Sequence, residues 1–253
     1  MLELYHSGHT TCSKQVRQCL TEKGIAYVSR YIELWSYENL GPDYLRLNPN
    51  GVVPTLVHDG VPLINSFCIM EYVEDVFPDR PLRPADPVDR AKQRLWSWIA
   101  DDVHPSVANA TYSTNMRGRH RNMDRATVDK VASMMPVPER RDRFLRTAGE
   151  GFSDRELDLA WARISFVLDR LEGALGAGPW IVGAFYSLAD VAMLAIVDRI
   201  KELKPEMIAP TRLPRVAAWH AASLARPAAA KVYAHDTDEV PRRPDRIAIR
   251  ATG

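Results

Sequence analysis

The sequence has little of what marks a secreted, membrane-bound or nucleic-acid-binding chain. Three cysteines in 253 residues are too few and too scattered for a disulfide framework or a zinc site of paired cysteines. No run of about 18 apolar residues occurs, and the opening MLELYHSGHTT lacks the basic and apolar stretches of an export signal. Thirty-three Lys and Arg against 32 Asp and Glu leave a net charge of +1. We therefore expect a cytoplasmic protein with no nucleic-acid partner and no membrane partner.

The first part of the chain carries the pattern of an α/β unit. Residues 2–6 alternate apolar and polar side chains as a short strand does, and the helical pattern that follows closes at Gly24. Residues 26–34 predict a second strand, which a right-handed crossover places parallel to the first. The apolar runs 53–57 and 61–64 flank an Asp-Gly turn, as the two strands of a hairpin do.

A proline-rich segment separates this unit from a helical one. Residues 78–87, PDRPLRPADP, contain four prolines and no periodicity, as linkers do. Ser66 is expected to cap a helix before it, and Ser187 with Asp190 forms a capping box after it. The later helices are expected at about 88–113, 124–147 in pieces, 154–176, 187–204 and 213–225. The predicted organisation is an α/β domain at 1–78, a linker at 79–87, an all-α domain at 88–233 and a tail at 234–253.

Several motifs occur in a fixed order along the chain. They are TTCSKQVR at 10–17, EKG at 22–24, NPNGVVPTL at 48–56, INS at 64–66, the proline-rich linker and YSLAD at 186–190. Together they resemble the cytosolic glutathione transferase superfamily. That resemblance implies a thioredoxin-like N-terminal domain plus an all-α C-terminal domain, glutathione as co-substrate and a homodimer.

Two bacterial subfamilies share further features with the chain. RPADP at 83–87, the long insertion near 112–152 and EGF at 150–152 look like the glutathione-dependent β-aryl etherases. PDYLRLN at 42–48 and the Cys12-Ser13 pair are similar instead to the tetrachlorohydroquinone reductive dehalogenases. Both activities stay open at this point.

The resemblance also implies how glutathione is held. It places a cis peptide bond between Val53 and Pro54, so that the backbone of Val53 pairs with the cysteinyl unit as an added strand would. Ser66 at a helix start offers its hydroxyl and N–H to the γ-glutamyl carboxylate. Asn65 stands where the family commonly has an acid or Gln, which shortens the reach to the γ-glutamyl amine. Asn39 is a candidate for the glycyl carboxylate.

Three residues compete to activate the glutathione thiol. A free thiol of pKa ~8.5 is only about 3% thiolate at neutral pH, so a donor or a positive field is needed. By resemblance, Cys12 falls on the reactive cysteine of the reductive dehalogenases, Ser13 on a serine of the etherases and Thr10 on the serine of zeta-type transferases. We favour Cys12, because a helix N-terminus acidifies a thiol that can then form a mixed disulfide with glutathione. A donor role for Ser13 and a merely structural Cys12 stay open, and Cys19 and Cys68 are expected in the core.

The second substrate is expected where the helical domain faces these residues. His104, Asn109, Tyr112 and Met116 follow Trp96 and Trp98 along one helical segment, and a subset of them must face the cleft. Between residues 117 and 146, nine Arg or Lys stand against four acids, which fits either an anionic aromatic substrate or a solvated helix face.

The expected function is attack of a glutathione thiolate on a hydrophobic, aromatic electrophile, with loss of an aryloxide or halide. A non-catalytic binding or interaction protein of the same fold is the alternative. His6 and His9 form a close pair without a third ligand nearby, so no metal site is expected.

Overall fold

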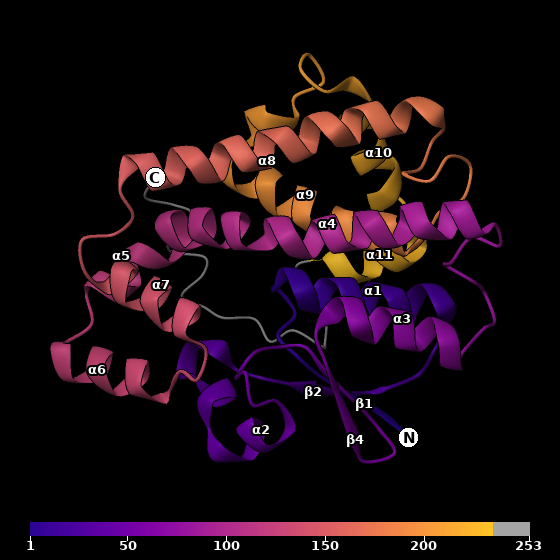
Figure 1. Ribbon diagram of the computed structural model, residues 1–253. Helices are drawn as coiled ribbons and strands as arrows, with labels where there is room; N and C mark the ends of the chain where they lie inside the picture. Colours follow the sequence, from indigo (N-terminus) through magenta and orange to yellow (C-terminus); the bar gives the residue numbers. More distant parts are fainter. Residues whose placement is uncertain (235–253) are drawn as a thin grey trace.

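The computed structural model describes residues 1–234, in which a small sheet lies against a larger body of helices (Figure 1). The first unit contains β1 Leu2–His6, α1 Thr11–Lys23, β2 Val28–Tyr31, short 3-10 turns at Leu34–Ser36 and Glu38–Leu40, α2 Pro42–Leu47, β3 Thr55–His58, β4 Val61–Ile64 and α3 Ser66–Val76. The sheet order is β2-β1-β3-β4, with β2 parallel to β1 and the other two pairings antiparallel. This is the thioredoxin-like arrangement that the βαβ and ββα patterns predict.

The second unit is all-α. Its elements are α4 Pro87–Thr111, a π-helical turn Tyr112–Met116, α5 Arg117–Arg121, α6 Arg125–Met134, α7 Pro138–Ala148, α8 Asp154–Ala174, a 3-10 turn Leu175–Ala177, α9 Leu188–Leu203, a 3-10 turn Pro205–Ile208, α10 Pro214–Leu224 and α11 Pro227–Tyr233. None of the helices in residues 1–234 is both long and apolar enough to cross a membrane.

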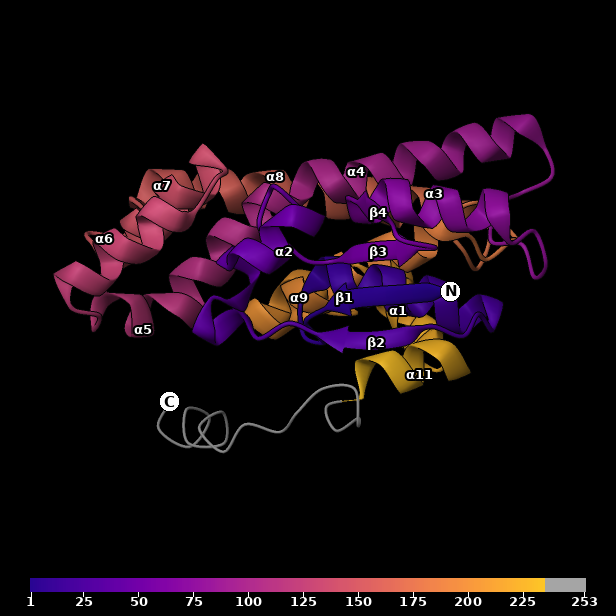
Figure 2. The ribbon, with the colours of Figure 1, turned by 90° about the horizontal axis from the view of Figure 1, so that it is seen from below.

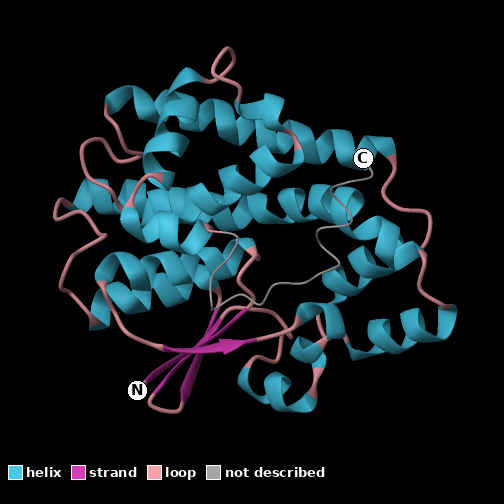
Figure 3. Cartoon of the chain, turned by 180° about the vertical axis from the view of Figure 1, so that it is seen from behind, coloured by secondary structure: helices cyan, strands magenta, loops and turns pink. Residues whose placement is uncertain are grey.

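Helices α1 and α3 lie between the sheet and the helical unit (Figures 1 and 2). One apolar core runs through both units, from Leu4 and Leu56 in the sheet, through Leu20 of α1, to Val103 of α4 and Leu194 of α9. All five side chains are fully buried. Figure 3 shows the strands gathered at one end, with helices forming the rest of the described chain. Helix α1 is therefore held against the helical unit by continuous packing.

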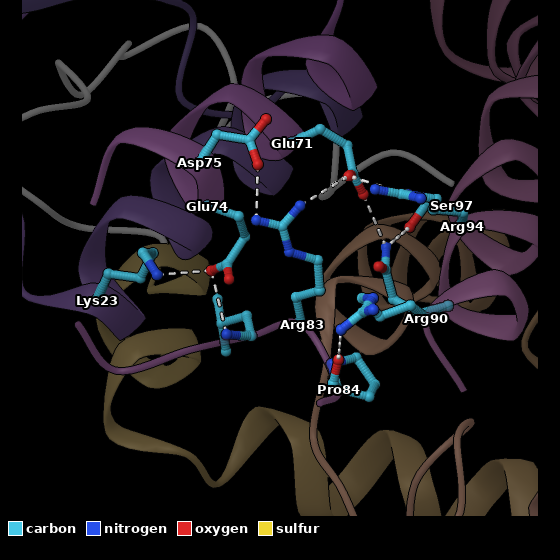
Figure 4. Close-up of polar contacts among 11 residues, drawn as sticks. Lys23, Glu71, Glu74, Asp75, Arg83, Pro84, Arg90, Arg94 and Ser97 are labelled. Atoms are coloured by element: carbon cyan, nitrogen blue, oxygen red, sulfur yellow. Dashed lines mark hydrogen bonds and ion pairs between the residues drawn. The ribbon is translucent and has the colours of Figure 1, made fainter. Parts of the chain in front are cut away.

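The proline-rich segment is tied to α3 by charged side chains (Figure 4). Lys23 of α1 and Glu74 form an ion pair of 2.6 Å that is shielded from solvent, and Glu74 also accepts from the Leu82 N–H. Arg83 lies 2.7 Å from Asp75. These bonds satisfy charges that would be costly to bury alone, and they fix where α4 begins.

The insertion folds as α5, α6 and α7 and packs on the first unit. Phe144 of α7 and Val128 of α6 share a small core with Leu40. Arg119 donates to the Trp35 carbonyl at 2.6 Å, and its guanidinium lies 4.5 Å from the centre of the Trp35 ring. These contacts hold α5, α6 and α7 against the segment 34–40 of the first unit, and Figure 1 shows the three helices together at one end of the molecule.

Some sequence-based expectations were wrong in detail. The second strand is only Val28–Tyr31, shorter than the expected 26–34, and α2 and α11 were not anticipated. Cys19 is fully buried as expected, but Cys68 is exposed on α3 and is not a core residue. The expected tail, apart from its first residue, lies outside the described residues.

Candidate functional site

The hydroxyls of Thr10 and Ser13 close the loop that leads into α1. Thr10 precedes the helix with an extended backbone, and its Oγ1 lies 2.6 Å from Ser13 Oγ and 3.0 Å from the Ser7 carbonyl oxygen. The Ser7 N–H donates to the same Ser13 oxygen at 3.3 Å. Because Ser13 has an exposed fraction of 0%, a ligand reaches its hydroxyl only by displacing neighbours. The geometry therefore gives Ser13 a part in holding the loop.

Cys12 differs from Ser13 because it is half-buried and has a partner from the other unit. Its Sγ lies 3.7 Å from Nε2 of His104 on α4. Burial raises the pKa of the Cys12 thiol, but the charge and hydrogen bond of His104 and the nearby Ser66 hydroxyl outweigh burial and hold the pKa below its ordinary value. The nearby charge of Asp101 acts the other way. Cys12 is thus placed to carry a thiolate.

Ser66 joins this cluster from the start of α3. Its hydroxyl donates to Gln15 Oε1 at 2.7 Å, and Gln15 Nε2 donates to the Ala192 carbonyl of α9 at 3.0 Å. The expectation that Ser66 caps α3 was wrong, because Asn65 is the cap and accepts from two backbone N–H groups of the first turn. Asn65 can do this because its backbone has a φ of 69°, which asparagine tolerates better than most residues. Ser66 is left as the polar side chain of α3 that faces Cys12.

Buried polar side chains hydrogen-bond to the backbone of the loop before β3. The Val53–Pro54 peptide bond is cis, as the motif implies. The Tyr44 hydroxyl donates to the Val52 carbonyl at 2.6 Å, and Asn39 Nδ2 donates to the Gly51 carbonyl at 2.7 Å. Asn39 is buried, so its amide supports the loop in this structure. The sequence did not indicate that Tyr44 supports this loop, because the contact joins the loop to a helix that was not expected.

The α4 residues proposed for the second substrate separate into distinct groups. His104 contacts Cys12, whereas Trp96 is part of the buried core and Trp98 is exposed. Asn109 Oδ1 accepts from Arg143 Nε of α7 at 2.8 Å, and the Arg143 guanidinium lies 5.7 Å from the centre of the Tyr112 ring. Tyr112 begins the π-helical turn, an irregularity that often occurs at functional sites.

Met116, the fourth residue proposed for the second substrate, ends that π-helical turn and is half-buried. Its part in substrate binding stays a prediction.

A cavity of about 450 Å³ lies on the α7 side of this helix. Asn109, Arg143, Arg146 and Phe152 are among its lining residues, whereas Cys12 and Ser66 are not. His104 does not line the cavity either, and the link between the cavity and the thiol cluster is Arg143, whose charge acts on His104. The cavity is large enough for an aromatic ring system.

The charges near His104 come from both units. Arg140 and Arg143 of α7 both act on its imidazole, and Arg140 also acts on Tyr44 of α2. From the sequence these arginines were only part of a basic stretch, because no local pattern shows which of them point inward.

Within residues 1–234, no group of three metal-ligating side chains comes together. The Nε2 atom of His6 instead bonds Ser29 Oγ at 2.8 Å.

Comparison with known proteins identifies relatives of both units. Residues 11–76 match the model of the glutathione S-transferase N-terminal domain, and residues 146–235 match that of the C-terminal domain. Protein LigF of Sphingobium sp. strain SYK-6 is 29% identical over 239 residues, covering 92% of this chain and 93% of LigF. The tetrachloro-p-hydroquinone reductive dehalogenase of Sphingobium chlorophenolicum is 27% identical over 209 residues, covering 80% of this chain and 84% of the dehalogenase.

The fold agrees with these sequence relationships. The crystal structure of the β-etherase LigF superposes with a TM-score of 0.87 over 92% of this chain and 98% of that one, at 29% identity. A glutathione transferase homologue from Sulfitobacter, solved with bound glutathione, has a TM-score of 0.68 over 92% of this chain and 96% of its own, at 20% identity, and supports the fold alone. With both domain models matched in order and the whole fold shared, this chain belongs to the glutathione S-transferase superfamily.

Proposed function

We propose that this chain is a glutathione transferase that uses the glutathione thiolate to attack a hydrophobic, aromatic electrophile. The observation that carries the proposal is the meeting of the Cys12 thiol, the His104 imidazole and the Ser66 hydroxyl at the N-terminus of α1. A partly buried site with one helix terminus and several donors stabilises a sulfur anion. Glutathione would bring its own sulfur to the same place.

Glutathione itself has a natural position beside these residues. Its γ-glutamyl carboxylate would lie at Ser66, since Asn65 already uses its side-chain oxygen on backbone N–H groups of α3. Its cysteinyl unit would run along the backbone of Val53, in the manner of an added strand. Asn65 would keep only its amide nitrogen for a ligand.

Two reaction types share this site. In a substitution, the glutathione sulfur forms a bond to carbon and the electron pair of the broken C–O or C–halogen bond leaves with the aryloxide or halide. In a reductive sequence, the Cys12 thiolate then attacks the sulfur of the glutathionylated product. An S–S bond forms, the S–C bond breaks, and the carbon leaves with the electron pair and takes up a proton. A second glutathione then attacks the mixed disulfide, which frees the Cys12 thiol and gives glutathione disulfide.

The arginines of α7 favour an electrophile that carries a negative charge. Arg140 and Arg143 lie near His104 rather than pointing wholly into solvent, and Arg143 is half-buried between Asn109 and Tyr112. A guanidinium held in this way pairs well with a phenolate or carboxylate. The substrate class proposed is therefore an anionic or phenolic aromatic electrophile, such as a β-aryl ether or a halogenated hydroquinone. A role in aromatic degradation would follow from that class.

Assembly and location stay predictions. The homodimer is carried over from the superfamily, and the outer faces of α4 and α8 leave apolar side chains exposed, among them Leu95, Trp98 and Phe166. A cytoplasmic location is expected from the composition alone.

The direct test of the activity is a panel of three electrophiles, a β-aryl ether, a halogenated hydroquinone and a simple chloroarene, each with reduced glutathione. We expect glutathione thioether or glutathione disulfide with at least one of the first two, and faster turnover than with the chloroarene, which lacks a charged group. Products are quantified by chromatography and mass spectrometry. The control replaces glutathione by S-methylglutathione, which has no ionisable thiol. An absence of turnover with all three substrates would favour the non-catalytic binding protein instead.

A further inference from the structure

The imidazole of His104 lies at the junction of the two units, in contact with Cys12. His104 lies on α4 between Ala100 and Val107, which share its helix face and are fully buried. Pro105 follows it inside the helix and removes one backbone N–H from the helical ladder. The side chain contacts Cys12, a residue 92 positions away in sequence. A histidine in contact with a thiol at the junction of two units is suited to proton transfer.

The charged and titratable groups around His104 come from three helices. Cys12 of α1 lies against the imidazole, Arg140 and Arg143 face it from α7, and Asp101 of its own helix acts on Cys12. The Cys12 thiolate raises the pKa of His104 and outweighs burial and the two arginines, which lower it. The contact with Cys12 therefore favours the imidazolium over the neutral imidazole.

We propose that His104 is a catalytic residue, the proton donor to the leaving group when the electrophile is an aryl ether. This inference rests on the proposed function. The thiolate sulfur bonds to carbon, the C–O bond breaks, and the aryloxide oxygen takes the proton from His104 Nε2. The neutral imidazole then takes up the proton of the next glutathione thiol, so that one glutathione and one ether give one thioether and one phenol, with no net oxidation.

Aryl ethers and halides differ in how basic their leaving groups are. An aryloxide is the anion of a phenol with a pKa near that of tyrosine, about 10, so protonation during departure helps it greatly. A halide is a very weak base and leaves as an anion without a proton. At the departure step His104 is consequently needed for ethers and not for halides, whereas a residue that only shapes the site or supports the sulfur anion would affect both alike.

The test compares the wild-type enzyme with His104→Gln on a series of aryl ethers of graded phenol pKa and on a halogenated substrate. Both substrates lose the help that His104 gives to the sulfur anion, and the ethers lose the proton donor as well. We therefore expect kcat for the least activated ether to fall about 30-fold further than kcat for the halide, and this difference to shrink as the phenol becomes more acidic. The wild-type rate with ethers should also fall as the pH rises through the pKa of His104, and His104→Gln should lack this fall.

The matched control is His58→Gln, since His58 lies on β3 and bonds the Tyr72 hydroxyl, away from the thiol cluster. A uniform loss on ethers and halides, or no loss on either, would overturn the role of His104. A misfolded variant is recognised by its melting curve, and His104→Asn then supplies the same ratio of ether to halide turnover. Inactivity of the wild-type enzyme on every substrate would instead remove the proposed function itself, so the two failures differ.

Discussion

Replacement of Cys12 by serine is expected to abolish the reductive sequence while leaving thioether formation largely intact. A hydroxyl cannot form the S–S bond that draws glutathione off the carbon skeleton, so the glutathionylated intermediate accumulates. The serine hydroxyl keeps a hydrogen-bonding group beside the glutathione sulfur, so the first step should change by no more than about 1 kcal/mol, or roughly 5-fold. Chromatography of the reaction with a halogenated hydroquinone measures both products. Wild-type protein should give glutathione disulfide and the dehalogenated ring, and Cys12→Ser the thioether.

Two controls make the assignment specific. Cys68→Ser changes an exposed thiol on α3 and should leave the product ratio as it is. Ser13→Ala removes a fully buried hydroxyl from the loop that contains Thr10, so it should lower stability by about 1–2 kcal/mol with the product ratio unchanged. If Ser13→Ala stops turnover in folded protein while Cys12→Ser does not, the serine is the activating residue and the assignment of Cys12 is wrong.

The second large effect concerns stability, and it lies in the helical unit. Asp190 is fully buried at the start of α9, where its carboxylate accepts from the Ser187 N–H at 2.9 Å, the Ile181 N–H at 3.0 Å and Trp219 Nε1 at 2.9 Å. Asp190→Ala leaves all three donors unpaired in the core. We expect the free energy of unfolding to fall by roughly 3–5 kcal/mol, measured by urea titration with the slope checked for two-state behaviour.

The matched control for this variant is Asp169→Ala, which removes an exposed carboxylate of α8 paired with Arg212 at 2.8 Å. Exposed ion pairs contribute little, so the change should stay within about 1 kcal/mol. A similar small loss in Asp190→Ala would mean that water replaces the carboxylate, and that the capping box does not anchor α9 as described.

The sequence predicted those features that local physics determines. The Ser187–Asp190 box is local, because both partners lie within one helical turn, and it is present as expected. The hairpin turn is local too, and Asp59 and Gly60 both have the positive φ that such a turn requires. What Asp190 does beyond its own turn, to Ile181 and Trp219, depends on packing that no local pattern records.

Other features depended on competition between neighbours. Asn65 and Ser66 are both good caps, and the sequence could not show that Asn65 adopts the positive φ that makes it the cap. Cys68 was expected in the core because a free cysteine is a small, apolar side chain. The buried side of α3 is formed by Ile69, Met70 and Val73, so Cys68 falls on the exposed side. A one-residue difference on a helix turns a side chain by about 100°.

The candidate site was predictable only in part for the same reason. Thr10, Cys12 and Ser13 lie within four residues, and the sequence could name all three without ranking them by exposure. The partner of Cys12 is 92 residues away, and His104 was proposed only for the second substrate. Arg140 and Arg143 needed the packing of α7 on residues 34–40 before their direction was known. Long-range contacts of this kind are fixed by the tertiary fold.

The central claim is that a glutathione sulfur is held at the N-terminus of α1 within reach of Cys12 and His104. The most direct measurement is a crystal structure of the protein with reduced glutathione at about millimolar concentration. This concentration lies near the upper end of typical KM values. We expect this structure to show the γ-glutamyl carboxylate at Ser66, the cysteinyl backbone along Val53, and the sulfur beside the Cys12–His104 pair. A tripeptide bound elsewhere, or a sulfur turned away from both side chains, would contradict it.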